Sequence, residues 1–247
     1  MTSDVAQEAP AGRRRHRGGR YGAGKFVRDV IVIILIAILA SYLLKTFVIR
    51  SFYIPSGSME NTLEINDRII VDELVPRFFP IRRGDVVVFT DPGGWLPPSP
   101  PEHRNAVATG VDWFLSQVGL SASDSDDHLV KRVIGIGGDH VVCCNASGQI
   151  TVNGHALKEP YTVIPAGHTA AATLHFNVRV PKGELWVMGD NRYNSQDSSR
   201  NQNLPGKGFV PVSDVVGRAV VISWPVSRWT WLSRYPQVFA GSSAGGA

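Results

Sequence analysis

The sequence predicts a mainly β protein, in which an N-terminal transmembrane helix precedes an extracytoplasmic domain of coiled antiparallel sheets or a partly open barrel. Two observations predict this fold class. An apolar run of about twenty residues lies near the N-terminus, and this is the length of helix that a bilayer core requires. Beyond residue 50, the chain is divided into short β-branched segments that are bounded by glycine, proline and other turn residues.

The chain begins with a basic tail. Residues 1–29 hold seven Lys or Arg against three acidic residues, an excess of +4 that equals the net charge of the whole chain. We expect residues 1–25 to form a disordered cytoplasmic tail, because they are rich in Gly, Ala and Arg. Since the positive charge lies in this tail and forms no groove-reading face, nucleic acid is not predicted as a partner.

A transmembrane anchor is predicted over residues 26–49. Residues 30–44 carry no charge, Lys45 interrupts the run, and residues 46–49 continue it. A terminal lysine can reach the interface, so the lipid bilayer is an expected partner. A cleaved signal peptide is less consistent, since no small-x-small site follows the run, and a buried core helix is rarely apolar on all sides. The basic flank places the N-terminus in the cytoplasm and the rest of the chain outside, in a single pass through the cell membrane.

An all-β domain is predicted over residues 50–235. Asn153-Gly154 lies between two extended segments and is typical of a two-residue hairpin turn. Residues 236–247 are expected to be a disordered tail. The segments whose composition predicts strands are 68–71, 85–90, 129–134, 140–144, 149–152, 173–180, 184–188 and 216–223.

A long connection, residues 91–128, separates two of these strands. It begins with a proline-rich stretch, and residues 106–118 could form a short amphipathic helix. A connection of this length is an insertion that is either functional or disordered. Near the other end of the domain, three tryptophans fall within residues 224–231. They are either core aromatics or part of a belt at the membrane interface, and the sequence leaves both open.

Neither a disulfide nor a metal site is predicted. The two cysteines, Cys143 and Cys144, are adjacent, and neighbours in sequence do not easily meet the geometry of an unstrained disulfide. The chain has no CxxC or HExxH motif, and its seven histidines show no ligand spacing. We therefore expect no cofactor. The sequence carries no signal of an oligomeric state.

A candidate nucleophile lies in residues 54–63, IPSGSMENTL. Pro55 fixes φ and Gly57 allows a substrate backbone to approach closely, so Ser56 and Ser58 lie on a rigid, accessible turn. A serine that attacks a carbonyl also needs a base. A Ser-His-Asp triad is not favoured, because neither His128 nor His140 lies in a motif that would position it.

A lysine is the other candidate base. A free lysine is protonated at neutral pH, but burial disfavours the charged form and can lower its pKa by several units. Among the lysines, Lys131 alone is embedded in an apolar strand, LVKRVIGIGGD. The alternative is an edge strand that shows Lys131 and Arg132 to solvent as a guard against aggregation. From spacing alone, the two interpretations are equally consistent with the sequence.

Several blocks of the chain resemble, in order, those of the type I signal peptidases, which are membrane-anchored serine/lysine proteases. The blocks are PSGSM after the apolar run, RRGDVVVF at 82–89, KRVIGIGGD at 131–139, MGDNRYNSQDSSR at 188–200 and GKGFVPVSDVVGRA at 206–219. The resemblance covers residues 26–232. The first four of these blocks, in this order behind an anchor, are highly specific, whereas any single block would be weak.

The resemblance implies a role for each matching residue. Ser58 resembles the nucleophile and Lys131 the general base. Ser56 and the backbone N–H of Ser58 would form the oxyanion hole, and Ser195 would hydrogen-bond the lysine amine. The residues of a supporting ion-pair scaffold would be Asp190, Arg132, Asp197 and Arg200.

The chain departs from the family pattern at four places. Asn61 stands where a proline is usual, which we expect to loosen the turn slightly. Gly137 replaces another proline, and Tyr193 replaces a common aspartate. An extra serine separates Asp197 from Arg200, so the role of Arg200 is the least secure.

The resemblance also implies a substrate, namely exported preproteins that are cut after a small-x-small sequence through an acyl-enzyme. The substrate would dock as an added strand. Its small side chains would enter shallow apolar pockets near Ile54 and Val86–Val88. Two alternatives remain: another Ser/Lys peptidase of similar fold, or a membrane-anchored β domain that binds exported proteins or cell-wall components without cutting them.

Overall fold

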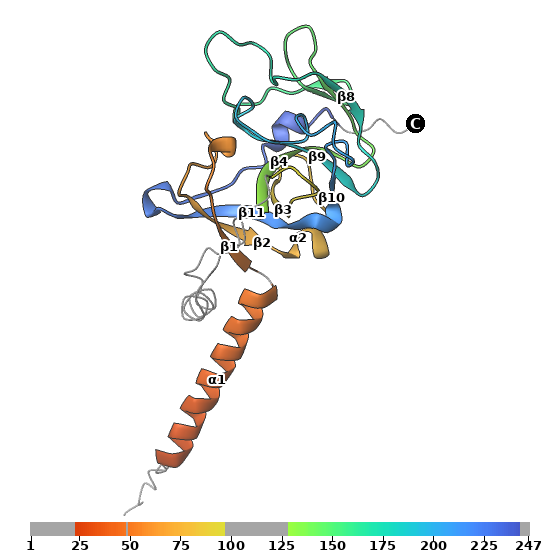
Figure 1. The fold of residues 1–247 in the computed structure, drawn as a ribbon. Coiled ribbons are helices and arrows are strands. Elements are labelled where there is room, and N and C mark those ends of the chain that lie inside the picture. Colours follow the sequence, from red (N-terminus) through yellow and green to blue (C-terminus); the bar gives the residue numbers. More distant parts are fainter. Residues whose placement is uncertain (1–22, 48, 97–127, 243–247) are drawn as a thin grey trace, which may run out of the picture. The chain divides into compact units, whose positions relative to one another are not determined.

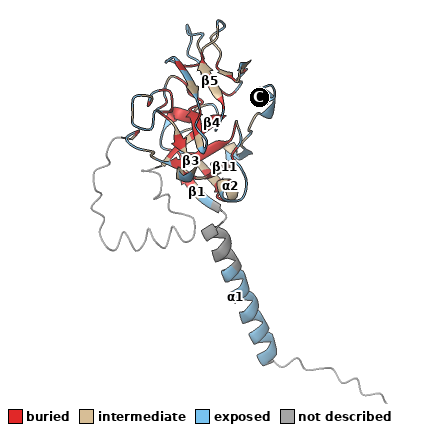
Figure 2. Cartoon of the chain, turned by 90° about the vertical axis from the view of Figure 1, so that its right-hand side faces the viewer, coloured by how far each residue is buried: buried red, intermediate tan, exposed pale blue. Residues whose placement is uncertain are grey.

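The computed structural model describes residues 23–47, 49–96 and 128–242 of the chain. By its contacts the chain divides into two units, residues 1–42 and 43–247, which are described separately. Helix α1 (Ala23–Phe47) begins in the first unit, and its described side chains, residues 24–39, are exposed (Figure 2). Among the described residues, no helix combines the length and the apolar character that a membrane span requires. The anchor predicted at 26–49 therefore stays a prediction.

The second unit is built on two antiparallel sheets (Figure 1). The larger sheet contains eight strands of the described chain, with β12 (Thr230–Trp231) paired to β11. Its other strands, in spatial order, are β1 (Ile49–Tyr53), β2 (Arg68–Asp72), β11 (Val215–Trp224), β3 (Val86–Thr90), β4 (His128–Ile136), β9 (Glu184–Met188) and β10 (Val210–Pro211). The smaller sheet has the order β7 (His155–Ala156), β6 (Thr151–Val152), β5 (His140–Cys143) and β8 (Phe176–Arg179).

Short helices connect these strands. The α-helical turn α2 follows β2, and the 3₁₀ turns lie in the loops. Their bounds are α2 (Leu74–Arg77), η1 (Gly57–Met59), η2 (Val212–Asp214), η3 (Val226–Arg228) and η4 (Pro236–Phe239).

The predicted mainly β fold with antiparallel sheets is confirmed. Each segment that the sequence assigned to a strand contains an observed one, and most boundaries agree within three residues. The hairpin at Asn153-Gly154 joins β6 to β7, and both residues have positive φ, 52° and 82°, as a two-residue turn of this kind requires. The sequence missed β1, because its first residue continues the apolar run and its middle is polar; its pairing with β2 is what defines it.

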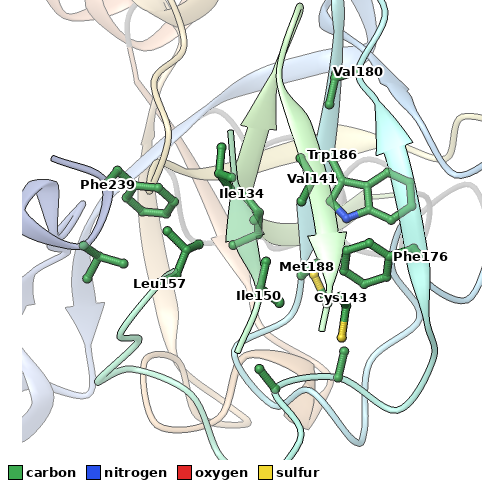
Figure 3. Close-up of a cluster of buried hydrophobic side chains, with 14 of the residues drawn as sticks. Ile134, Val141, Cys143, Ile150, Leu157, Phe176, Val180, Trp186, Met188 and Phe239 are labelled. Carbon is green, nitrogen blue, oxygen red and sulfur yellow. The ribbon is translucent and has the colours of Figure 1, made fainter. Parts of the chain in front are cut away.

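Many of the buried residues lie on the central strands β3, β4 and β11 of the larger sheet (Figure 2). One cluster joins the two sheets, with Trp186 fully buried beside Phe176 and Val141 (Figure 3). Val238 and Phe239 belong to this cluster and are 5% and 7% exposed. The prediction of a disordered tail from residue 236 was therefore wrong at its start, because two apolar side chains of η4 are buried on folding.

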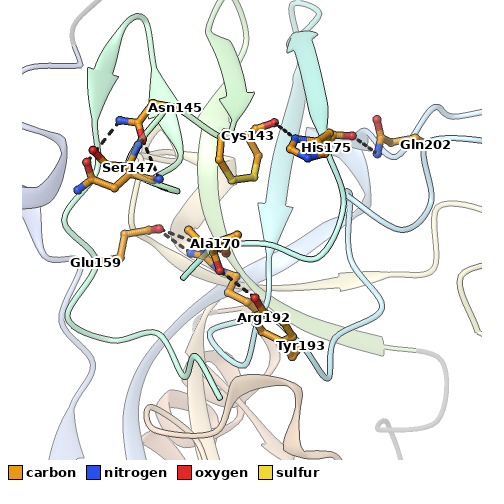
Figure 4. Close-up of a disulfide and its surroundings, with 12 residues drawn as sticks. Cys143, Asn145, Ser147, Glu159, Ala170, His175, Arg192, Tyr193 and Gln202 are labelled. Carbon is orange, nitrogen blue, oxygen red and sulfur yellow. Dashed lines mark hydrogen bonds and ion pairs between the residues drawn. A yellow bond between two sulfur atoms is a disulfide. The ribbon is translucent and has the colours of Figure 1, made fainter. Parts of the chain in front are cut away.

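The structure also corrects the prediction for the cysteines. Cys143 and Cys144 form a disulfide at the end of β5 (Figure 4). The peptide bond between them is cis, and the sequence gives no sign of that. The helix predicted at 106–118 and most of the insertion lie outside the described residues, as does most of the N-terminal tail.

Candidate active site

Ser58 lies in the 3₁₀ turn η1, which a set of backbone hydrogen bonds holds in place. Ile54 donates to the carbonyl of Asp67 and accepts from the amide of Asn66, both at 2.9 Å. On the other side, the amide of Asn191 donates to the carbonyl of Ser58 at 3.1 Å. The serine turn is thus fixed at both ends to neighbouring loops.

Two glycines allow these loops to approach the serine. A Cβ atom at Gly57 would collide with the side chain of Glu60, whose carboxylate accepts a hydrogen bond from Asn191 Nδ2 at 2.7 Å. A Cβ atom at Gly189 would collide with Ser195 Oγ and with the carbonyl of Ser58. Close backbone packing requires glycine at residue 189, whereas a side chain at residue 57 would displace the carboxylate of Glu60.

Asn61 closes the serine turn in the left-handed conformation, with φ of 77°. Proline cannot adopt this φ, which accounts for its replacement here. The side chain of Asn61 donates to the carbonyl of Tyr161 at 3.0 Å. This hydrogen bond connects the turn to a distant segment, and the expected loosening of the turn stays a prediction.

Lys131 and Arg132 lie in the interior of the larger sheet. Strand β4 pairs with β3 along residues 128–132 and with β9 along residues 132–136. Lys131 is 3% exposed and Arg132 is fully buried. The interpretation of this pair as a solvent-facing guard was therefore wrong.

The amine of Lys131 meets the hydroxyl of Ser58. Lys131 Nζ lies 2.8 Å from Ser58 Oγ and 3.0 Å from the carbonyl oxygen of Val130. Burial lowers the pKa of Lys131 to about 8, although the carboxylates of Asp197 and Asp190 act in the opposite direction. A lysine with this pKa is partly neutral near neutral pH, so its lone pair can accept the hydroxyl proton of Ser58.

Arg132 and Asp190 form a buried ion pair beneath this contact. The guanidinium donates to both carboxylate oxygens of Asp190, at 2.8 Å and 2.6 Å, and to the carbonyls of Gly84 and Ser233. The ring of Tyr161 covers the guanidinium at 4.1 Å from the ring centroid. This pair therefore connects β4 to three separate loops.

Asp197 holds the loop beside Lys131. Its carboxylate accepts hydrogen bonds from the amide of Gly189 at 3.0 Å and from the hydroxyl of Ser199 at 2.7 Å. Arg200 makes no ion pair with this carboxylate; it is exposed and donates to the carbonyl of Tyr193 at 3.2 Å. Of the predicted scaffold, Asp190, Arg132 and Asp197 lie together, and Arg200 lies apart.

Ser195 lies next to the site but does not make its expected contact. Its hydroxyl is buried, and within the described part of the chain it has no hydrogen-bond partner. The predicted hydrogen bond to Lys131 is therefore absent from this structure, in which the amine bonds to Val130 and Ser58. Ser56 is nearer, since its hydroxyl lies 3.4 Å from Ser58 Oγ.

The sequence missed a second buried ion pair. Arg192 forms a two-pronged contact with Glu159, at 2.9 Å and 2.6 Å, and donates to the carbonyl of Ala171 (Figure 4). Tyr193 follows it and donates its hydroxyl to the carbonyl of Ala170 at 3.1 Å. Glu159 lies in a loop with no motif, so only the buried arginine next to the GDN block could have indicated this pair.

His140 and His128, the two candidate histidine bases, form their contacts away from the Ser58 hydroxyl. His140 Nε2 pairs with Asn177 Oδ1 at 2.6 Å, on the smaller sheet. His128 packs its ring against Phe52, with 5.3 Å between ring centroids, and its Nδ1 is buried without a partner among the described residues. Neither histidine shares a hydrogen bond with Ser58 Oγ, whose partners are Lys131 and Ser56, so the arrangement supports no histidine base.

A cavity of about 200 Å³ opens beside Ser58 and Lys131. The residues that line it are 52–56, 58–59, 96 and 128–131. Ile54 lies in this wall as predicted, but Val86–Val88 do not, because they are buried in the core at 0–2% exposure. Leu96 was missed, since it follows a proline- and glycine-rich stretch in which no pattern marks it.

The sequence matches the family model for signal peptidases, peptidase S26, over residues 27–224. The chain belongs to the signal peptidase family. It is 43% identical to a probable signal peptidase I of Mycobacterium leprae, over 71% of this chain and 68% of that protein. It is also 42% identical to the signal peptidase I of Mycobacterium tuberculosis H37Rv, over 82% of this chain and 74% of that protein.

A solved structure of a signal peptidase I from Enterococcus faecalis V583 is a weaker match. It is 22% identical with a TM-score of 0.36, over 56% of this chain and 96% of that one, which is too slight to carry an argument. As a member of the signal peptidase family, the chain is a serine endopeptidase, and the alternative of a β domain that binds without cutting no longer applies. The described residues contain no group of three potential metal ligands.

Proposed function

We propose that this signal peptidase removes signal peptides from exported preproteins, with Ser58 as nucleophile and neutral Lys131 as general base. One observation carries the proposal: the Lys131 amine lies 2.8 Å from Ser58 Oγ, in a buried site where its pKa is lowered to about 8. Both residues also stand in the family blocks. We assign residues 50–235 to the catalytic domain.

The reaction runs through an acyl-enzyme. Ser58 Oγ attacks the scissile carbonyl carbon and gives its proton to Lys131 Nζ, and the carbonyl electrons move to the oxygen. The tetrahedral intermediate collapses as the new lysine proton passes to the leaving amine. A water molecule then attacks the ester and loses its proton to Lys131. As the ester C–O bond breaks, Lys131 gives this proton to Ser58 Oγ, which restores the hydroxyl and the neutral amine. No step requires a cofactor.

The developing oxyanion needs donors. We assign this role to the backbone N–H of Ser58 and the hydroxyl of Ser56, which already lies 3.4 Å from Ser58 Oγ. Ser56 is exposed, so its hydroxyl can turn toward a bound substrate. A donor of this kind is worth about 3 kcal/mol in the transition state.

The substrate backbone would add as a strand between two walls of the cavity. Strand β1 forms one edge of the larger sheet, and residues 53–56 continue from it along the cavity. On the opposite wall, residues 128–131 pair with β3, while the pairing with β9 begins only at Arg132. Their second edge has no strand partner among the described residues, which supports docking by strand addition.

We further propose that residues 26–49 anchor the enzyme in the cell membrane, with residues 1–25 in the cytoplasm and the catalytic domain outside. The support is the uncharged run at 30–44, its basic N-terminal flank and the helical conformation of α1. Ser58 then follows the end of the anchor by only a few residues. The active site would lie close to the outer leaflet, where cleavage sites emerge.

The proposal is tested by cleavage of a preprotein with an Ala-x-Ala site, using purified full-length protein in detergent. We expect Ser58→Ala and Lys131→Ala to abolish cutting and Ser56→Ala to lower it about a hundredfold. Ser147→Ala, at the exposed turn near β5, is the matched control and should cut normally.

Two results would contradict the dyad. Normal cutting by Lys131→Ala would return the search for the base to His128 and His140. Cutting by a correctly folded Ser58→Ala would assign the nucleophile to another residue, and Ser56 would be tested first. Near-native melting temperatures of the variants would show that lost activity is not lost folding.

A further inference from the structure

Leu96 reaches the active-site cavity from outside the two strands that form its walls. It is the only cavity-lining residue of the described chain that comes from residues 60–127. The others belong to the end of β1 and the segment after it, the serine turn and the start of β4. Leu96 also packs against the core cluster that contains Phe89, Trp95 and Leu129. It therefore links the cavity wall to the interior of the domain.

The turn that precedes Leu96 is fixed by one carboxylate. Asp91 Oδ1 accepts hydrogen bonds from the amides of Gly93 at 2.9 Å and Trp95 at 3.0 Å, and Oδ2 accepts from the amide of Leu96 at 3.0 Å. Although partial burial raises it, these backbone donors hold the pKa of Asp91 below its usual range. The carboxylate is thus ionised, and it fixes the backbone of Leu96 directly.

Trp95 fixes the same turn from the other side. It is 4% exposed and meets Phe89 edge-on, with 5.8 Å between ring centroids and an interplanar angle of 86°. Phe89 lies in β3, which pairs with β4 beside Lys131. A buried aromatic and a three-donor carboxylate together hold Leu96 on a rigid support, so its side chain is a fixed part of the cavity.

We propose that Leu96 is a specificity-determining residue, which limits the size of the substrate side chain that enters the cavity, and that Asp91 positions it. This inference rests on the proposed function. The cavity of about 200 Å³ has its two walls fixed by β1 and β4. A smaller or larger side chain at Leu96 therefore changes the space for the substrate side chain without altering the Ser58–Lys131 contact. The ligand class is a peptide with a small side chain at one position before the cut.

The test measures kcat/KM on two peptide series, each of which varies one of the two small positions through Gly, Ala, 2-aminobutyrate and Val. We expect Leu96→Ala to raise cleavage of the larger residues relative to Ala by about tenfold or more, at one of the two positions only. One methylene in an apolar pocket is worth about 10- to 200-fold. Leu96→Phe should shift the preference the other way, from Ala toward Gly.

Asp91→Asn should change the same ratio in the same direction as Leu96→Ala, but less, because the leucine stays while its support weakens. Leu174→Ala, a matched leucine truncation that is 42% exposed and outside the cavity, should leave the ratio unchanged. A ratio that also stays unchanged in both Leu96→Ala and Leu96→Phe, while the Ala peptide is still cut, overturns the proposal.

This outcome is distinct from failure of the proposed function. If wild type cuts neither series, or if Ser58→Ala cuts as wild type does, the result contradicts the proposed Ser58–Lys131 dyad. It does not contradict the role of Leu96. If Leu96→Ala loses all activity together with its melting transition, Leu96→Phe decides alone, because it retains an apolar side chain on the same turn.

Discussion

The burial that lowers the pKa of Lys131 also destabilises the folded protein. Burial lowers its pKa from 10.5 to about 8, so below pH 8 the folded protein holds a charge that the interior disfavours. Between pH 8 and 10.5 the unfolded chain binds the lysine proton and the folded chain does not. The free energy of unfolding that this group controls therefore rises with pH across that window.

Replacing Lys131 with Met tests this cost. We expect Lys131→Met to unfold at higher denaturant concentration than wild type at pH 7, by an amount on the order of 3 kcal/mol. The difference should shrink toward pH 10.5, because the wild-type lysine is then neutral in both states. Denaturant titrations at several pH values measure it. A difference that is constant with pH would show that the lysine is not held neutral by burial.

A second prediction for a single residue concerns the backbone conformation of Asn61. Asn61→Pro should destabilise the protein by more than about 1 kcal/mol, because φ of 77° is closed to proline. Asn61→Gly is the matched control: it keeps the left-handed conformation and loses only the bond to Tyr161. Denaturant midpoints of the two variants measure the effect. If proline proved as stable as glycine, the turn would adopt another conformation.

Strand β4 is the element that organises the site. Its consecutive residues Lys131 and Arg132 are both buried, one against Ser58 and the other against Asp190. An apolar strand with two charges predicts nothing about which neighbours it has. The sequence therefore left an edge strand and a buried base equally open, and the burial of both side chains in the folded domain decides between them.

Removing the carboxylate partner of Arg132 should lower the free energy of unfolding. Asp190→Asn leaves a buried guanidinium without its carboxylate, and we expect a loss of about 3–5 kcal/mol in the free energy of unfolding. Asp214→Asn, the same change at a surface carboxylate, should cost less than about 1 kcal/mol. Equal losses in the two variants would mean that the Arg132–Asp190 pair does not hold the loops together.

The elements that the sequence predicted well are those with local signals. Strand segments and the Asn153-Gly154 turn depend on neighbouring residues, and the family blocks identify Ser58, Lys131 and Asp190. The elements that it missed depend on contacts between distant segments. Val238 and Phe239 are buried in the cluster that joins the two sheets, and Glu159 pairs with an arginine more than thirty residues away. Leu96 is partly buried against a cluster that includes residues of β4 and β9.

At the scale of the whole molecule, the chain combines helix α1 with a catalytic domain that needs access to preproteins. If residues 26–49 span the membrane, full-length protein reconstituted with phospholipid vesicles should float with them and stay bound in 1 M salt. Electrostatic attraction of the basic tail alone would be screened, since the Debye length at that salt is about 3 Å. Release by salt would show attachment through the tail only and contradict the anchor.

The central claim is that neutral Lys131 takes the proton of Ser58, and the pH profile of kcat/KM tests it most directly. Measured on an Ala-x-Ala peptide with wild-type enzyme, kcat/KM reports the base of the free enzyme. The account predicts that it rises with pH to a half-maximum near pH 8, the pKa of Lys131. A half-maximum near pH 6.5, the ordinary value of histidine, would contradict the account and make His128 the candidate base.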